Sequence, residues 1–279
     1  MELDLELEDY DLIRLTKVTE GNKLNIIVVN GFLSEGDRNC SDWLSLIEHA
    51  YPHHTVEHYD WEACNTTSSL INLLASDFSK SFLDIVFDGA TLNNSSCLLK
   101  STVEVGLKQW ESAMRNTEKA GFLLSRHIDR SEGQFILMGH SLGAKVIYHC
   151  LESMKMTDKV VSSVLFGGAV EKDVKWEGLL NKHSQMNILN GYSINDSVLK
   201  KLYPFGSKMS NPIGLCPIEV SYSRRLCNID MSEVVSGHTK YKTSTVGVFL
   251  KHYMSGDISG TKILKVSCLN PLGYFGLSS

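Results

Sequence analysis

The sequence predicts an α/β fold, in which a mostly parallel central sheet is covered by helices on both faces. Short apolar runs of strand length alternate with longer stretches of helical period, as in a chain built from βα units. The runs Leu24–Val29 and Val160–Phe166 are almost continuously apolar, which is typical of strands buried on both faces. The composition of 43% hydrophobic and 21% charged residues is near the globular average and disfavours disorder, collagen and coiled coil.

The length favours one large domain. The chain has 279 residues, and α/β domains of roughly 200–250 residues are common, although about 150 residues per domain would suggest two. No internal repeat or low-complexity tract divides the chain. We therefore expect a single domain over residues 1–279.

The individual elements follow from the periodicity of apolar residues along the chain. An alternating edge strand is expected first, over Asp11–Thr19, before a glycine-containing turn. Further strands are expected over Leu24–Asn30, Thr55–Tyr59, Gln134–Met138, Val160–Phe166, Met186–Asn190 and Leu226–Ile229. Helices are expected over Trp43–Ala50, Leu70–Phe87, Gly106–Ile128, Leu142–Met154, Trp176–His183, Asp196–Leu202 and Tyr241–Tyr253.

Two stretches differ in composition and are candidate cap or lid loops. Residues 202–217 contain three of the 5 prolines, so we expect neither a regular helix nor an inner strand there. Residues 88–101 are rich in Asn and Ser and are also expected to form a loop. For residues 202–217 an ordinary connecting loop remains the alternative.

Charge and cysteine content exclude several classes of function. Lys+Arg of 27 against Asp+Glu of 32 gives a net charge of −5 without a basic block, so nucleic acid is not an expected partner. The 7 cysteines are scattered without a C-x-x-C pair, which favours a reduced protein without a zinc site. The clustered His53, His54 and His58 are not expected to bind metal, because adjacent side chains in a strand point in opposite directions.

The N-terminal sequence has neither the positive segment nor the apolar core of a signal peptide. No stretch approaches the roughly 20 apolar residues that span a bilayer. We therefore expect no transmembrane segment, and a protein that is cytoplasmic or exported without a cleaved signal peptide, for example as an effector.

The motif that carries chemistry is Gly139-His140-Ser141-Leu142-Gly143, a G-x-S-x-G sequence. The bare pentapeptide occurs by chance, but here an apolar strand leads directly into it and a stretch of helical period follows. A serine becomes a nucleophile when it projects from a sharp strand-to-helix turn, where the glycines allow close approach of the chain. The start of the next helix also places backbone N–H groups beside it. We therefore predict that Ser141 is a nucleophile.

In such a nucleophile elbow, the acid and then the histidine follow the serine along the chain. Asp196, in the loop after a predicted strand, is the first choice for the acid, and helix capping is its alternative role. Asp230 is the rival acid and Asp173 a weaker one. His238 is the chosen histidine because it lies on a glycine-flanked turn just before a helix. The other downstream histidines, which lie in helices or break the chain order, are His149, His183 and His252.

Each of these residues has a separate predicted role in catalysis. Asp196 orients the ring of His238, and His238 takes the proton of Ser141 as general base and returns it to the leaving group. The oxyanion requires two N–H donors, which we expect to be the backbone groups of Leu142, directly after the nucleophile, and Phe32, in the loop after an early strand. For the loop that holds Phe32, a simple turn remains the alternative.

With these residues in view, the chain resembles the α/β-hydrolase superfamily, and within it the family of the transmembrane and coiled-coil domain-containing protein 4. The resemblance spans most of the chain and is carried by Val29–Leu33, Tyr59–Glu62, Ala120–Gly121, Gly139–Ile147, Phe166–Ala169, Asn190–Asp196 and Ile229–Tyr241. It implies an α/β-hydrolase fold and a lipase-like serine hydrolase. The chain departs from the family at His140, where members often have Phe, and at Ser197, where many have Trp. It also lacks the hydrophobic membrane segments of the eukaryotic members.

We therefore expect a serine esterase that works through an acyl-enzyme and needs no cofactor. The resemblance and the apolar, proline-rich loop favour a lipid or phospholipid acyl ester as substrate, and they leave peripheral contact with a membrane surface open. Thioesters, amides and peptides also remain open, because no feature of the sequence distinguishes leaving groups. A non-catalytic binding module of the same fold is a further alternative, against which the presence of all three triad residues argues.

Overall fold

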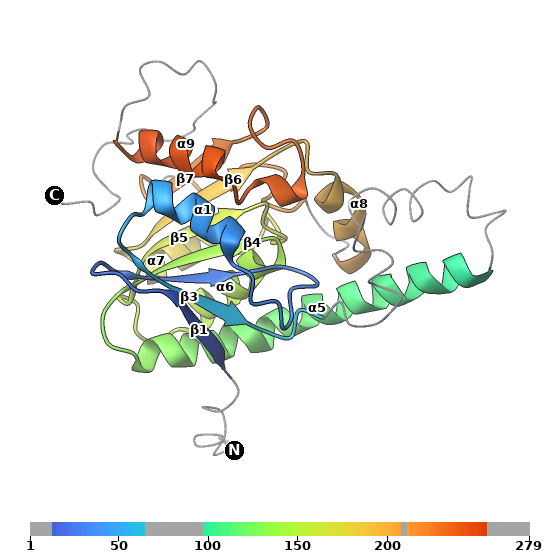
Figure 1. The fold of residues 1–279 in the computed structure, drawn as a ribbon, viewed down its shortest axis with the longest axis horizontal. Coiled ribbons are helices and arrows are strands. Elements are labelled where there is room, and N and C mark those ends of the chain that lie inside the picture. Colours follow the sequence, from blue (N-terminus) through green and yellow to red (C-terminus); the bar gives the residue numbers. More distant parts are fainter. Residues whose placement is uncertain (1–12, 65–96, 208–210, 222, 256–279) are drawn as a thin grey trace.

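A seven-stranded sheet forms the centre of the computed structural model, which describes residues 13–64, 97–207, 211–221 and 223–255 (Figure 1). The strand order is β1-β3-β2-β4-β5-β6-β7. Strand β1 runs antiparallel to β3, and the other neighbouring strands pair in parallel. The strands are β1 (Arg14–Thr19), β2 (Asn25–Val29), β3 (Thr55–Asp60), β4 (Phe135–His140), β5 (Val160–Phe166), β6 (Asn187–Tyr192) and β7 (Leu226–Asp230). The predicted mostly parallel sheet with an edge strand at its start is confirmed.

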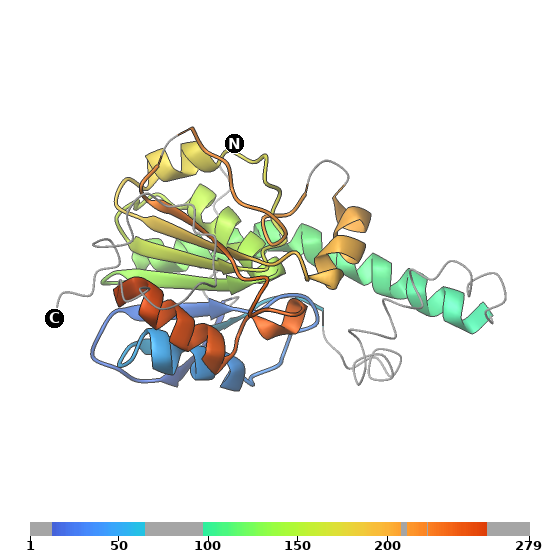
Figure 2. The same cartoon turned by 90° about the horizontal axis from the view of Figure 1, so that it is seen from above.

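Helices cover both faces of this sheet, as the turned view in Figure 2 shows. Helices α1 (Ser41–Ala50) and α9 (Ser244–Ser255) pack together on one face. Helices α5 (Cys97–Arg130), α6 (Leu142–Ser153) and α7 (Trp176–Lys182) lie on the other. Helix α8 (Ser197–Gly206) follows β6 and lies beyond the carboxyl end of that strand.

Alternation along the strands divides the apolar residues between two cores. In β2, Ile27 and Val29 pack into the core under α5 and α6, whereas Ile26 and Val28 pack into the core under α1 and α9. All four side chains are fully buried, and burial of each contributes roughly 1.5–3 kcal/mol. A strand buried on both faces needs no polar positions, which explains the continuous apolar run in the sequence.

The direction in which the chain adds strands reverses between β2 and β4. The chain leaves β2 through α1 towards β3, and it leaves the adjacent β4 through α6 towards β5 on the other side. Since α1 and α6 lie on opposite faces, the loops after β2 and β4 lead to opposite sides of the sheet at this topological switch point. Such points are where ligands bind in parallel α/β sheets. The loop after β2 holds Phe32 and the turn after β4 holds Ser141.

The predicted end of the loop 88–101 and the predicted start of the next helix at Gly106 are both wrong. Helix α5 begins at Cys97, so the last five residues of the predicted loop 88–101 are helical, and Gly106 lies inside the helix. Leu98, Leu99 and Lys100 are good helix formers, and an isolated interior glycine costs only about 1 kcal/mol. Residues 88–96 and the predicted helix Leu70–Phe87 lie outside the described residues.

The segment 202–217 is partly helical, against the prediction. Helix α8 continues to Gly206 with Pro204 inside it. Pro204 has no N–H to donate and its ring crowds the carbonyl four residues earlier, but the buried Leu202 and Tyr203 anchor this end of the helix in the core. Residues 211–217 are irregular, as predicted, and are fixed to the loop after β5 by a bridge between Glu171 and Pro212.

Candidate active site

Ser141 lies on a strained turn between β4 and α6. Its backbone angles, φ 59° and ψ −122°, are unusual for a residue other than glycine, and such conformations cost about 1–3 kcal/mol. Three backbone hydrogen bonds stabilise the turn. The Ser141 N–H donates to the Phe166 carbonyl at 3.0 Å, and the Ser141 carbonyl accepts from the N–H groups of Ala144 at 3.1 Å and Ala169 at 3.0 Å. Hydrogen bonds to β5, to the loop after it and to α6 therefore keep Ser141 in its strained conformation.

Glycines around Ser141 allow the loop after β2 to lie against it. A Cβ atom on Gly143 would lie only 2.1 Å from the Val29 carbonyl oxygen. A Cβ atom on Gly31 would lie 2.7 Å from the Ser141 Cβ and 3.1 Å from its Oγ. These distances agree with the prediction that the glycines permit close approach of the chain.

Asp196 and His238 form a hydrogen-bonded pair although 42 residues separate them. The His238 Nδ1 lies 2.7 Å from the Asp196 Oδ2, and the carboxyl group is fully buried. The other oxygen, Oδ1, accepts the N–H of Leu199 at 3.0 Å and so caps α8. One oxygen of Asp196 therefore contacts His238 and the other caps α8. Since an ionised carboxylate only accepts, the His238 Nδ1 donates and its Nε2 is left as an acceptor.

The rival residues make other contacts. The Asp230 Oδ1 accepts the N–H of Ser232 at 3.0 Å, an arrangement typical of an Asx turn. The His149 Nδ1 lies 3.5 Å from the Glu152 Oε2, and the His183 Nε2 lies 2.8 Å from a main-chain carbonyl oxygen of α6. His252 lies in α9, and the weaker acid Asp173 is exposed.

His140, directly before Ser141, contacts the loop that carries His238. Its Nε2 lies 2.8 Å from the His238 carbonyl oxygen, and the two ring centroids are 4.6 Å apart. Burial, with the nearby charges of His238 and Lys242, puts the pKa of His140 well below its usual value. The ring is therefore neutral and its Nε2–H donates to the carbonyl. The motif does not predict this contact, because the position before the serine varies in it.

The two residues expected to donate to an oxyanion lie at the same edge of the sheet. Leu142 is the first residue of α6, and Phe32 follows Gly31, whose backbone lies against Ser141. The Phe32 ring packs edge-on against Trp110 of α5, with centroids 5.4 Å apart. The Leu33 N–H donates to the Ala63 carbonyl at 2.9 Å. These contacts connect the loop to both α5 and the end of β3.

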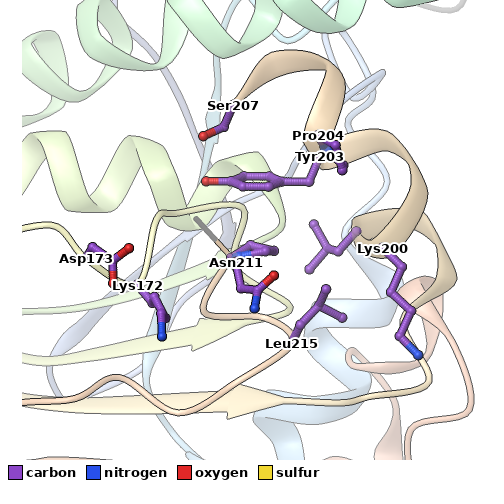
Figure 3. Close-up of a pocket in the computed structure, with 10 residues that line it drawn as sticks. Lys172, Asp173, Lys200, Tyr203, Pro204, Ser207, Asn211 and Leu215 are labelled. Atoms are coloured by element: carbon purple, nitrogen blue, oxygen red, sulfur yellow. The ribbon is translucent and has the colours of Figure 1, made fainter. Parts of the chain in front are cut away.

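A neighbouring pocket of about 440 Å³ lies between α8 and the loops after β5 and α8 (Figure 3). Tyr203 and Ser207 from the end of α8 lie on one side of it, and Lys172 and Asp173 lie on another. Its other lining residues are Leu199, Lys200, Pro204, Asn211, Pro212 and Leu215. The pocket therefore borders the segment predicted as a lid and is separate from Ser141.

Within the described ranges, no group of three or more His, Cys, Asp or Glu residues is arranged to hold a metal ion. The clustered histidines have other contacts. The His54 Nδ1 lies 3.0 Å from the Tyr51 carbonyl oxygen, and the His58 Nε2 lies 3.3 Å from the Asn30 Nδ2.

The doubly wound sheet and the serine on a strained strand-to-helix turn define an α/β-hydrolase fold, and the predicted fold class is confirmed. The chain belongs to the family described as "Protein of unknown function (DUF726)", whose model matches residues 3–253.

Two relatives are similar to parts of the chain. An uncharacterized membrane protein of Caenorhabditis elegans is 31% identical over 140 residues, which is 47% of this chain and 22% of that protein. The transmembrane and coiled-coil domain-containing protein STS1 of Oryza sativa is 27% identical over 235 residues, or 77% of this chain and 34% of that protein. The chain thus spans about a fifth to a third of the length of these relatives. No helix in the part of the chain that the structure describes has the length and apolar character to cross a membrane.

Two solved structures are similar at low sequence identity. Mouse alpha/beta hydrolase domain-containing protein 10 is 11% identical with a TM-score of 0.41, covering 88% of this chain and 93% of that one. A monoacylglycerol lipase of Paleococcus ferrophilus is 11% identical with a TM-score of 0.42, covering 86% of this chain and 95% of that one.

Acid is expected to destabilise the fold through its buried and half-buried histidines. Burial lowers the pKa of six of them, namely His54, His58, His127, His140, His149 and His183. Their pKa in the unfolded chain is about 6.5, so below that pH the unfolded state binds more protons and the free energy of unfolding falls.

Urea unfolding followed by circular dichroism checks this expectation. The midpoint should stay level from about pH 8 to 7 and decline steadily from about pH 6.5 to 5, above the range in which carboxylates titrate. His140→Gln should make the decline shallower, because one titrating group is lost. A midpoint that is constant or rises over the acid range would contradict the expectation.

Proposed function

We propose that this protein is a serine hydrolase that cleaves carboxylic esters through an acyl-enzyme on Ser141. The observation that carries the proposal is the Asp196–His238 pair, whose Nδ1–Oδ2 distance is 2.7 Å. His238 packs against His140, the residue that directly precedes Ser141. A buried carboxylate that fixes the tautomer of an imidazole is one half of the arrangement that activates a serine nucleophile, and the proposal adds the other half, transfer of the Ser141 proton to that imidazole.

In the proposed reaction, the His238 Nε2 accepts the hydroxyl proton while the Ser141 Oγ forms a bond to the ester carbonyl carbon. The backbone N–H groups of Leu142 and Phe32 donate to the oxyanion that develops on the carbonyl oxygen. His238 then gives the proton to the leaving alkoxide as the carbon–oxygen bond breaks. A water molecule, deprotonated by His238, then attacks the acyl carbon, and His238 returns that proton to the Ser141 Oγ as the bond between the acyl carbon and Oγ breaks, which releases the acid.

The proposed substrate class is a lipid or phospholipid acyl ester. Its support is the resemblance to lipase-like hydrolases, carried by segments such as Gly139–Ile147 and Ile229–Tyr241, and the apolar character of residues 211–217. Within its family, we place the chain with the relatives of the transmembrane and coiled-coil domain-containing protein 4, and one similar protein, that of Oryza sativa, carries a related name. Peripheral contact with a membrane surface belongs to the same proposal.

A series of p-nitrophenyl esters from acetyl to palmitoyl tests both parts of the proposal. The wild-type protein should hydrolyse them with kcat/KM highest at octanoyl or longer chains. Ser141→Ala should lower kcat by about 10³-fold or more, since the nucleophile is lost while the fold is kept.

Each part can fail separately. Equal rates for wild type and Ser141→Ala, or no hydrolysis of any ester or thioester, would overturn the serine hydrolase. A profile that is flat or highest at acetyl would leave an esterase and overturn the lipid substrate.

A further inference from the structure

Asn30, the residue directly after β2, is the centre of a buried polar network. Its Oδ1 accepts hydrogen bonds from the Trp43 Nε1 and the Lys242 Nζ, both at 2.8 Å. Its Nδ2 lies 3.3 Å from the His58 Nε2, and its carbonyl oxygen accepts the Trp61 Nε1 at 2.9 Å. Burial lowers the pKa of His58, so its neutral Nε2 can accept the amide N–H. Asn30 thereby fixes the start of the loop that carries Phe32.

Lys242 reaches this network from the other end of the chain. It lies four residues after His238, and its side chain is only 11% exposed. Besides Asn30, its ammonium contacts the Asp42 carboxylate and lies 5.3 Å from the centroid of the Trp43 ring. A largely buried ammonium is stable only when charged and polar partners compensate the loss of water. The 30–43 segment supplies those partners.

The contacts of Lys242 with Asn30 and Asp42 join two loops whose relative position matters for the proposed reaction. One loop lies against the nucleophile, because the Gly31 backbone packs on Ser141. The other carries His238, whose carbonyl oxygen accepts a hydrogen bond from the His140 ring. In a preorganised site a displacement of about 1 Å can reduce the rate about 100-fold. The position of each loop relative to the other therefore matters for the rate and not only for stability.

We infer that Lys242 is a positioning residue. By binding Asn30 and Asp42, it fixes the loop that carries Phe32 (residues 31–35) relative to the loop that carries His238 (residues 236–241), so that both keep their positions around Ser141. The inference rests on the proposed function, and it adds residues that the sequence motif does not contain. It requires Lys242 to act through Asn30 and Asp42, without contact with substrate.

The main experiment compares Lys242→Met with Lys242→Arg and with the matched control Lys240→Met, using p-nitrophenyl butyrate and the full chain. Lys240 is exposed in the same segment. Lys242→Met should lower kcat about 10- to 100-fold with KM within about threefold. Lys242→Arg should recover about tenfold of that loss, because a guanidinium can bind both Asp42 and Asn30. Lys240→Met should match the wild type.

Hydrogen exchange by mass spectrometry gives a second readout that does not depend on activity. Both loops hold measurable amides, since the Leu33 N–H bonds the Ala63 carbonyl at 2.9 Å and the Lys240 N–H bonds the Gly237 carbonyl at 3.0 Å. Lys242→Met should increase deuterium uptake in residues 31–35 and in residues 236–241 together. Asp42→Ala should also increase deuterium uptake in both loops and should lower kcat. If Lys242 acted only through its positive charge, Asp42→Ala would leave kcat unchanged or raise it.

The results separate this inference from the proposed function. A wild-type protein that hydrolyses nothing would overturn the hydrolase, while the exchange data would still decide whether Lys242 joins the two loops. A folded Lys242→Met protein with kcat within about threefold of wild type, or with increased uptake in only one loop, would overturn the inference. If Lys242→Met does not fold, Asp42→Ala and Lys242→Arg decide by the same criteria.

Discussion

Asp196→Asn is expected to lower kcat by about four orders of magnitude while leaving the protein folded. The asparagine oxygen can still cap α8 at the Leu199 N–H, so most of the local stability is kept. Its NH₂ group would face the His238 Nδ1 and could bond it only if that nitrogen became an acceptor. The proton would then lie on Nε2, which could no longer accept the proton of Ser141. Steady-state kinetics with a p-nitrophenyl ester, together with an unfolding curve, measure both effects.

Asp230→Asn is the matched comparison for the acid. The Asp230 Oδ1 accepts the Ser232 N–H at 3.0 Å, and an asparagine oxygen can do the same. We expect kcat within about threefold of wild type. If Asp230→Asn causes the large loss and Asp196→Asn does not, the assignment of Asp196 is wrong.

Gly143→Ala is expected to have the largest effect on folding. The new Cβ would lie 2.1 Å from the Val29 carbonyl oxygen and 2.8 Å from that of Asn30, and both are backbone atoms at the end of β2. Alanine favours a helix over glycine by about 1 kcal/mol, whereas forcing extra volume into a closely packed site costs about 1–3 kcal/mol or more. The collision should therefore dominate, so that the free energy of unfolding falls or no folded protein is recovered.

Gly178→Ala provides the control for that experiment. Gly178 is exposed in α7, and a Cβ there would meet only the Lys175 Cβ at 3.7 Å, an ordinary contact. Without a collision, the helix preference should raise the free energy of unfolding by up to about 1 kcal/mol. A Gly143→Ala protein as stable as Gly178→Ala would show that β2 does not pack against the turn as described.

The elements that the sequence predicts well are those encoded by local patterns. The continuous apolar run of β2 reports burial on both faces, and the glycines beside Ser141 report close packing of the chain. The sequence also predicts that Ser141, Asp196 and His238 lie at one edge of the sheet, because each follows a predicted strand and the carboxyl ends of parallel strands lie at the same edge. The structure brings Asp196 and His238 together there.

Other features depend on contacts that no local pattern encodes. The bond between Asn30 and Lys242 joins residues 212 positions apart, and a lysine in a polar segment ordinarily indicates a solvated surface. Helix α8 continues through Pro204 because the buried Leu202 and Tyr203 hold it, so tertiary packing outweighs the local preference of proline. The start of α5 at Cys97 differs from the prediction for another reason, since of residues 97–101 only Ser101 belongs to the residue types that indicate a loop.

Labelling with a fluorophosphonate probe, followed by peptide mass spectrometry, tests whether Ser141 is the activated nucleophile. We expect one adduct, located on Ser141, that is absent in Ser141→Ala and forms far more slowly in Asp196→Asn. A folded wild-type protein that takes up no probe, or takes it up equally well after Ser141→Ala, would show that Ser141 is not the nucleophile.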